Sequence, residues 1–126
     1  VLESQLASGL MPDSEAKTVR RELVQVYDRA GALTKAINAA KNYINTYGHD
    51  ADLSIYVAAK ALETKDYKAA AIWSKKAIDG ERAASRKAPE TWYRIRMKSA
   101  YEGKDMASYY AAIEDVAAIY PNETYW

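Results

Sequence analysis

Small and apolar residues recur every three or four positions along much of the chain, with charged and polar residues between them. The stretch 52–63 places Leu53, Val57 and Leu62 along one such stripe, and the stretch 67–78 repeats the spacing. Because a helical turn takes 3.6 residues, this period is typical of amphipathic helices and differs from the alternation of strands. Both stretches are rich in alanine, a strong helix former. The pattern predicts two antiparallel helices joined by a short turn.

This helix–turn–helix pattern returns along the chain. The turn KDY at 65–67 falls on GAL at 31–33 when the sequence is shifted by 34 residues. The turn appears again as KDM at 104–106, 39 residues downstream, and the five extra residues lie in the segment ERAASRKAPE at 81–90. A fixed period of this length predicts an array of similar helix pairs.

A helix–turn–helix unit of 34 residues resembles the tetratricopeptide repeat, whose consensus is W-x2-L-G-x2-Y, then A-x3-F and a closing proline. Leu23, Tyr27 and Ala36 match slots of this consensus in the first unit, and Pro121 closes the third. In the second unit the matching residues are Val57, Ala58, Ala61 and Ala70. The resemblance implies an all-α fold, a right-handed superhelical solenoid of antiparallel helix pairs.

The third unit departs from the consensus. Arg96 and Met97 occupy the Leu-Gly slots, and Tyr109 occupies the alanine slot. Helices cross closely only where side chains are small, so these bulky residues predict a wider crossing in this unit.

The resemblance implies a single domain over residues 1–126. Its expected parts are the tail of a preceding repeat with a turn at 1–16, repeat 1 at 17–50, repeat 2 with its insertion at 51–88, repeat 3 at 89–122, and the start of a truncated further repeat at 123–126. Because the sequence stays alanine-rich to about Ser85, we expect the second helix of repeat 2 to be about one turn longer than usual.

Individual residues predict where helices begin and end. Gly48 is expected to end the second helix of repeat 1, and Asp50 to cap the helix that follows. Asp13 or Ser14 is expected to cap the first helix of repeat 1.

The composition excludes several classes of function. Lys and Arg number 18 against 17 Asp and Glu, so no overall basic excess indicates nucleic acid or an anionic membrane as a partner. The segment 82–98 carries a local net charge of +5 with interleaved aromatic residues, but its basic residues are expected on solvated helix faces. An acidic protein segment is therefore favoured over nucleic acid as its partner.

The termini and the cysteine content bear on the compartment. The chain has no cysteine, and no apolar run is long enough to span a bilayer. It opens VLESQLASG, without an initiator Met or a signal peptide, which indicates a mature or trimmed fragment. The Tyr-Pro at 120–121 followed by Tyr-Trp at 125–126 resembles proteobacterial tetratricopeptide proteins of the cell envelope. That resemblance slightly favours the periplasm or cell envelope over the cytoplasm.

The residues needed for catalysis are not assembled in the sequence. His49 is the single histidine and falls in a predicted surface loop, so a metal site lacks further His or Cys ligands. Glu114 and Asp115 are neighbours on a predicted helix and point about 100° apart, so they cannot flank one reacting bond. No serine lies in a nucleophile motif, and no glycine-rich loop could cradle phosphate. We therefore expect a protein without enzymatic activity, cofactor or metal.

The remaining candidate site is the concave groove that the first helices of successive repeats line in such solenoids. Its middle is expected to be small and apolar, and its third-repeat end basic and aromatic, which suits a peptide with acidic and apolar side chains. The expected groove residues are Arg21, Gln25, Ile55, Ala59, Leu62, Arg94, Lys98 and Tyr101.

Two functions from different classes follow. The first is a non-catalytic scaffold that binds a protein or peptide segment, expected to be acidic, in this groove. The alternative is a structural spacer or self-association segment of a longer repeat protein, in which exposed ends of the array pair between molecules. A role as an accessory to an enzyme domain elsewhere in a longer protein also stays open.

Overall fold

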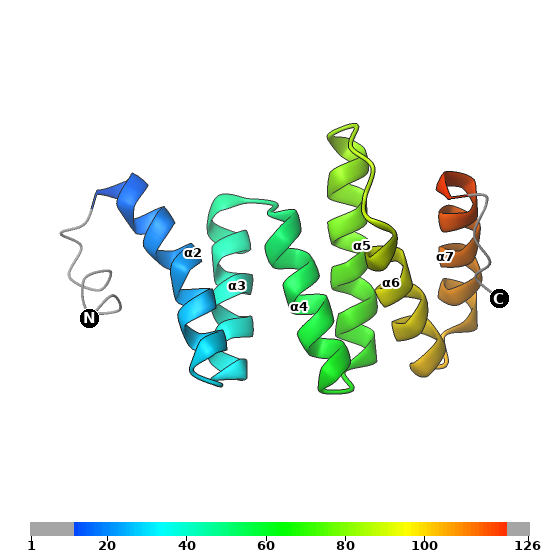
Figure 1. Ribbon diagram of the computed structural model, residues 1–126, viewed down its shortest axis with the longest axis horizontal. Coiled ribbons are helices and arrows are strands. Elements are labelled where there is room, and N and C mark those ends of the chain that lie inside the picture. Colours follow the sequence, from blue (N-terminus) through cyan, green and yellow to red (C-terminus); the bar gives the residue numbers. More distant parts are fainter. Residues whose placement is uncertain (1–11, 121–126) are drawn as a thin grey trace. The chain divides into compact units, whose positions relative to one another are not determined.

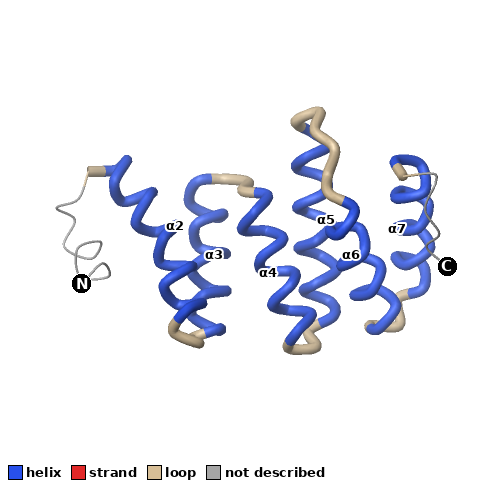
Figure 2. Tube along the Cα trace, viewed as in Figure 1, coloured by secondary structure: helices blue, strands red, loops and turns tan. Residues whose placement is uncertain are grey.

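The computed structural model describes residues 12–120, and these residues form six α-helices and no strand. The all-α prediction is therefore confirmed. Short turns join the helices, and consecutive helices run in opposite directions within each pair (Figures 1 and 2). The expected preceding-repeat tail, Pro121 and the further repeat around Trp126 lie wholly or mostly outside the described residues. The helices are α2 (Asp13–Arg29), α3 (Leu33–Tyr47), α4 (Ala51–Glu63), α5 (Tyr67–Ala83), α6 (Glu90–Glu102) and α7 (Met106–Ile119).

The chain forms two compact units, Val1–His49 and Asp50–Trp126. In the first unit, α2 packs against α3. In the second, each helix packs against the next along the chain, and α4 also contacts α6. Helices that pack mainly against their sequence neighbours are what an array of helical hairpins requires.

The same turn closes all three hairpins. The residue after the C-cap has a left-handed backbone in each: φ is 75° at Gly31, 64° at Lys65 and 60° at Lys104. The next residue is the N-cap of the second helix. Its N–H donates a hydrogen bond to a carbonyl five residues earlier, for example from Asp66 N to Ala61 O at 2.8 Å. The recurrence seen in the sequence is thus a recurrence of backbone conformation.

We expect the substitutions Lys65→Gly and Lys104→Gly each to raise the free energy of unfolding by about 0.5 to 1 kcal/mol, because glycine adopts a positive φ without steric strain. Lys65→Ala is the matched control, since alanine removes the charge and keeps the Cβ atom. Urea titration would check this, and equal stabilities of the Gly and Ala variants would contradict it.

Local caps explain several helix ends. Gly48, with φ of 95°, ends α3, and the Asp50 carboxylate accepts a hydrogen bond from Leu53 N at 3.0 Å, so both expectations are confirmed. The expectation for the start of α2 is wrong: Pro12 is the N-cap, and no side chain caps this end. Asp13 already lies inside the first turn, where its negative charge interacts favourably with the positive end of the helix dipole.

The buried core consists largely of small and branched side chains along the facing sides of the helices. Ala36 and Ala40 are fully buried in the first unit, as are Ala58 and Ala70 in the second. Buried hydroxyls need partners, and Ser74, which replaces the aromatic residue of the consensus, donates to Ala70 O at 2.7 Å. The wider helix crossing expected in the third unit stays a prediction.

The insertion before α6 is anchored at several points. Helix α5 continues to Ala83, longer than α3 or α7, as its alanine-rich sequence predicts. Arg86 then donates two hydrogen bonds back to Glu81, at 2.8 and 2.9 Å. Further on, Ala88 is fully buried, and its carbonyl accepts from the Tyr120 hydroxyl at 2.7 Å. The extra residues therefore close the end of the core around α7.

Tyr93 is the largest fully buried side chain among the described residues, and its hydroxyl has no hydrogen-bond partner there. Burial raises the pKa of Tyr93 above its ordinary value, because the phenolate loses hydration. We expect Tyr93→Phe to be neutral or stabilising by up to about 1 kcal/mol at pH 7, since the unpaired hydroxyl costs free energy.

The same tyrosine predicts a loss of stability at alkaline pH. The pKa of Tyr93 is higher in the folded than in the unfolded state. The contribution of the neutral hydroxyl to the free energy of unfolding is therefore complete below about pH 10 and falls as the pH rises toward the folded-state pKa. Urea midpoints at pH 7 and pH 10.5 would check this against Tyr93→Phe. An advantage of the Phe variant that fails to grow with pH would contradict it.

Candidate functional site

A hollow of about 510 Å³ opens between the first helices of the two pairs in the second unit, and we call it the α4–α6 hollow. Three residues of each helix line it, and neighbours within each trio are at most four positions apart. Each trio therefore lies on one side of its helix. The chain between α4 and the start of α5 completes the wall. The lining residues are Ala59, Leu62, Glu63, Lys65, Tyr67, Ile95, Lys98 and Glu102.

A glycine permits the close packing beside this hollow. A Cβ atom added at Gly103, just after α6, would lie 3.1 Å from the Cβ of Tyr67 at the start of α5. The absence of a side chain therefore lets the first residue of α5 approach the end of α6.

The chemistry of the α4–α6 hollow is mixed. Ala59, Leu62 and Ile95 form an apolar part. Two cations and two carboxylates surround it, and Glu63 is paired with Lys60 at 3.4 Å. Lys65 and Lys98 form no ion pair within the described residues, and neither does Glu102. The hollow can therefore take an apolar side chain and offers ammonium groups to a carboxylate, beside one carboxylate of its own.

The structure brings three of the expected groove residues together here: Ala59, Leu62 and Lys98 line the α4–α6 hollow. Ile55 is half-buried on α4, one turn before Ala59, and does not line the hollow. Arg94 lies on α6 one turn before Lys98, and its Nε donates to Glu90. An exposed pair of this kind is worth little, so Arg94 can exchange its partner.

Tyr101 lies outside the hollow, in a cluster of tyrosines at the end of α6. Its ring centroid is 5.3 Å from that of Tyr109, which is 5.7 Å from that of Tyr110. Tyr101 and Tyr110 are 56% and 59% exposed. Tyr109 is half-buried between them, and we call these three rings the tyrosine patch.

Arg21 and Gln25 belong to the first unit. They line a small hollow of about 280 Å³ together with Lys17, Thr18, Glu22 and Tyr43. The Gln25 side-chain oxygen accepts from Arg29 at 3.3 Å. The binding role of these residues, and of those in the second unit, stays a prediction.

Some lining residues were not expected. Ile95 and Glu102 continue the stripe of Lys98 on α6, so extending the helical period by one turn in each direction would have found them. Tyr67 is also outside the expected set, and in the structure it is half-buried and lines the hollow.

Two other hollows lie within single units. One, of about 680 Å³, lies along α5, α6 and α7 and contains Arg96 and Ile72. Arg96 is nearly buried and donates to Asp115 at 2.7 Å, so its charge is compensated. The other lies between α2 and α3 in the first unit, and its lining includes Asn38 and Asn42, which were not among the expected residues.

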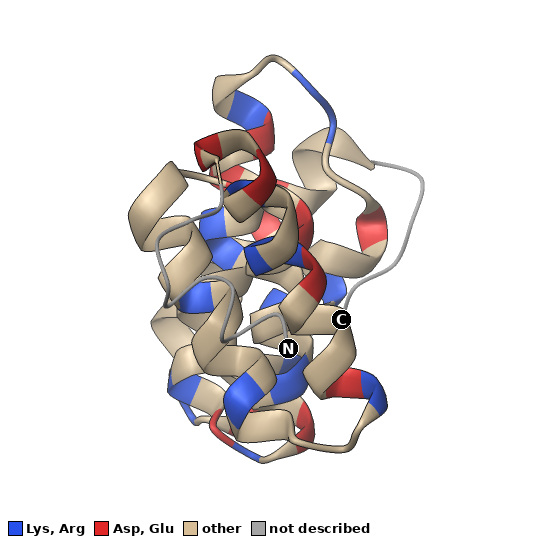
Figure 3. Cartoon of the chain, turned by 90° about the vertical axis from the view of Figure 1, so that its left-hand side faces the viewer, with Lys and Arg blue, Asp and Glu red and all other residues tan. Residues whose placement is uncertain are grey.

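Charges of both signs are mixed along the described helices, as Figure 3 shows. His49 is exposed, and no group of three or more His, Asp or Glu residues between 12 and 120 is placed to hold a metal ion. Within the same range, no helix has the length and apolar character needed to cross a membrane. Comparison of the chain with protein-family models, with curated proteins and with solved structures finds no match.

Proposed function

We propose that this chain is a non-catalytic scaffold whose helix pairs form a tetratricopeptide-like solenoid and bind a peptide segment beside α4 and α6. The observation that carries the proposal is the α4–α6 hollow, because it places Ala59 and Leu62 of one first helix opposite Lys98 of the next. The shared turn geometry of the three hairpins supports the repeat, since equal turns produce equivalent helix pairs.

The lining suggests what the bound segment contains. An apolar side chain would pack against Leu62 and Ile95, and a neighbouring carboxylate would pair with Lys98. Arg94 and Tyr101 lie on the same stripe of α6 as Lys98, so they extend the contact surface along the helix. A segment with an acidic residue next to Leu, Ile or Met fits this arrangement.

Selection from a random heptapeptide display library tests the proposal. We expect the wild-type chain to enrich sequences with Asp or Glu next to an aliphatic residue, and Lys98→Glu to lose that enrichment. Arg82→Glu is the charge-matched control, because Arg82 is exposed on α5 and does not line the hollow. The proposal is wrong if no sequence family is enriched, or if Lys98→Glu selects the same family as the wild type.

The tyrosine patch favours a second candidate, self-association of a structural segment. The exposed rings of Tyr101 and Tyr110 lie on either side of the half-buried Tyr109, and together with Met106, which is 39% exposed, they form an apolar surface of the kind found in interfaces. Sedimentation velocity across a wide concentration range would test it. Association that Tyr110→Ser abolishes would support this candidate, and a monomer at millimolar concentration would exclude it.

A further inference from the structure

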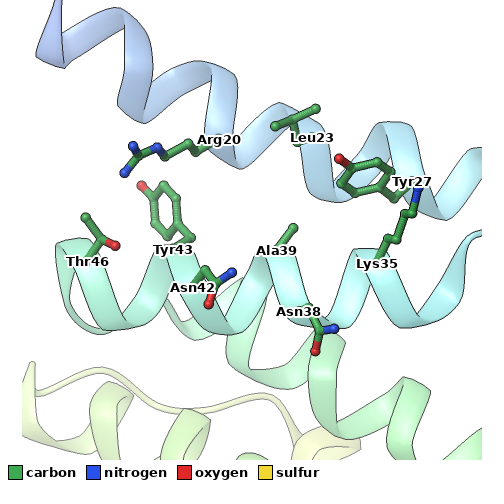
Figure 4. A pocket seen from close by; sticks show the side chains of 9 residues that line it. All are labelled: Arg20, Leu23, Tyr27, Lys35, Asn38, Ala39, Asn42, Tyr43 and Thr46. Atoms are coloured by element: carbon green, nitrogen blue, oxygen red, sulfur yellow. The ribbon is translucent and has the colours of Figure 1, made fainter. Parts of the chain in front are cut away.

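The hollow of the first unit, which we call the α2–α3 hollow, has a different chemistry from the α4–α6 hollow. It measures about 560 Å³ and lies between the two helices of the hairpin (Figure 4). Arg20, Leu23 and Tyr27 of α2 line one side, each separated from the next by three or four positions. The α3 side consists of Lys35, Asn38, Ala39, Asn42, Tyr43 and Thr46.

The polar residues of α3 form one stripe along the hollow. Lys35, Asn38, Asn42 and Thr46 follow one another at spacings of three, four and four positions, so they share one side of the helix. The side-chain amides of Asn38 and Asn42 make no hydrogen bond to any described residue. Each amide thus presents a donor and an acceptor, the combination that pairs with a peptide group.

The charges of the hollow are positive and uncompensated. No carboxylate is among the lining residues, and α3 contains no acidic residue. Arg20 donates to the Tyr47 hydroxyl at 3.4 Å and lies over that ring, while Lys35 lies 5.9 Å from the centre of the Tyr27 ring. Aromatic rings therefore position both cations without neutralising them.

Figure 4 shows Arg20 and Thr46 at one end of the hollow and Lys35 beside Tyr27 at the other. This separation does not suit a compact anion such as a single phosphate, which would need clustered cations. The aromatic faces are also covered, since Tyr43 is buried and Lys35 lies over Tyr27. Stacking of a sugar or a base would need such faces free.

The spacing of the stripe matches an extended peptide. Four helical residues rise about 6 Å, so Asn38, Asn42 and Thr46 follow each other at nearly the roughly 6.6 Å repeat of two residues in a strand. From Lys35 to Thr46 the helix rises about 16 Å, the length of about five extended residues.

We propose that the α2–α3 hollow binds an extended peptide segment of about five residues with acidic side chains at both ends. Asn38 and Asn42 pair with its backbone at alternate residues, and Arg20 and Lys35 each bind one terminal carboxylate side chain. The central side chain, which points the same way as the two acidic ones, packs on Leu23 and Ala39.

Titration of the full 126-residue chain, labelled with ¹⁵N, tests this with the probe Ac-Glu-Ser-Val-Ser-Glu-NH2. We expect the side-chain amide signals of Asn38 and Asn42 to shift in the millimolar range or below. The matched peptide Ac-Gln-Ser-Val-Ser-Gln-NH2 should bind at least tenfold more weakly. Salt at 0.5 M should strongly lower the affinity for the acidic peptide.

Two sets of variants separate the parts of the site. The double variant Asn38→Ala, Asn42→Ala should lower the affinity for the acidic peptide at least fivefold. Asn45 is an exposed residue of α3 outside the hollow, so Asn45→Ala should leave the affinity unchanged. Arg20→Gln with Lys35→Gln should abolish the preference for Glu over Gln. Circular dichroism of each variant would verify that the helices are retained.

Three results would overturn the proposal: no shift of the Asn38 and Asn42 amides with the acidic peptide, equal binding of the Glu and Gln peptides, or an effect of Asn45→Ala as large as that of the double variant. Binding of an oligothymidylate at the same amides, without binding of the peptide, would assign the hollow to nucleic acid and would also overturn it.

Discussion

Asp115→Ala is expected to lower the free energy of unfolding by about 2 to 3 kcal/mol, because it leaves the guanidinium of Arg96 buried without its carboxylate. The Arg96 side chain is 7% exposed, and its nitrogen lies 2.7 Å from the Asp115 oxygen. The expected cost stays below the roughly 3 to 5 kcal/mol of fully buried pairs, since Asp115 is itself 37% exposed.

Urea denaturation followed by tryptophan fluorescence would measure this, because Trp73 and Trp92 lie in helices of the second unit. Asp79→Ala is the matched control: it removes an exposed pair with Lys75 at 2.6 Å and should cost less than about 0.5 kcal/mol. The double variant Arg96→Met, Asp115→Leu should regain most of the lost stability, because no buried charge remains. Equal effects of Asp115→Ala and Asp79→Ala would contradict the prediction.

Ala70→Leu is expected to destabilise the second unit by about 1 to 3 kcal/mol through overpacking. Ala70 is fully buried on α5, and Ala58 is fully buried on the neighbouring α4, so three additional carbon atoms find no space without moving a helix. Thermal unfolding would show the loss as a lower midpoint.

Ala83→Leu is the control for this substitution, since Ala83 is exposed in the last turn of the same helix. Leucine is nearly as good a helix former as alanine, so the control should change stability by less than about 0.5 kcal/mol. An unchanged midpoint for Ala70→Leu would mean that the register inferred from the repeat is wrong.

The helices themselves were predictable because they depend on local spacing. The three-and-four period of apolar residues predicted the pairs, and the recurring turn at 31–33, 65–67 and 104–106 marked the place where each first helix ends. The cap at Asp50 was predictable for the same reason, since it bonds an N–H three residues away. The sequence did not predict Pro12 as the N-cap of α2, because the usual capping residues Asp and Ser follow it directly at positions 13 and 14.

The candidate sites were predictable only in part. The helical period placed Ala59, Leu62 and Lys98 on the sides of two helices, and the structure shows that these sides meet in one hollow. It did not indicate that Asp115 pairs with Arg96, or that the Tyr101 ring contacts that of Tyr109. These contacts depend on rotamers and on neighbours that a one-dimensional pattern does not contain.

The amino-acid sequence by itself determined the helical class, the pairing of consecutive helices and the positions of the turns, because each depends on residues within one or two helical turns of each other. Only the tertiary structure decided which polar residues are paired and which are free. Arg96 and Lys35 look alike in sequence as basic residues of helices, yet the first is buried against Asp115 and the second stays uncompensated beside Tyr27. The physical reason is that the partner of Arg96 comes from another helix, and helix packing sets the distance between them.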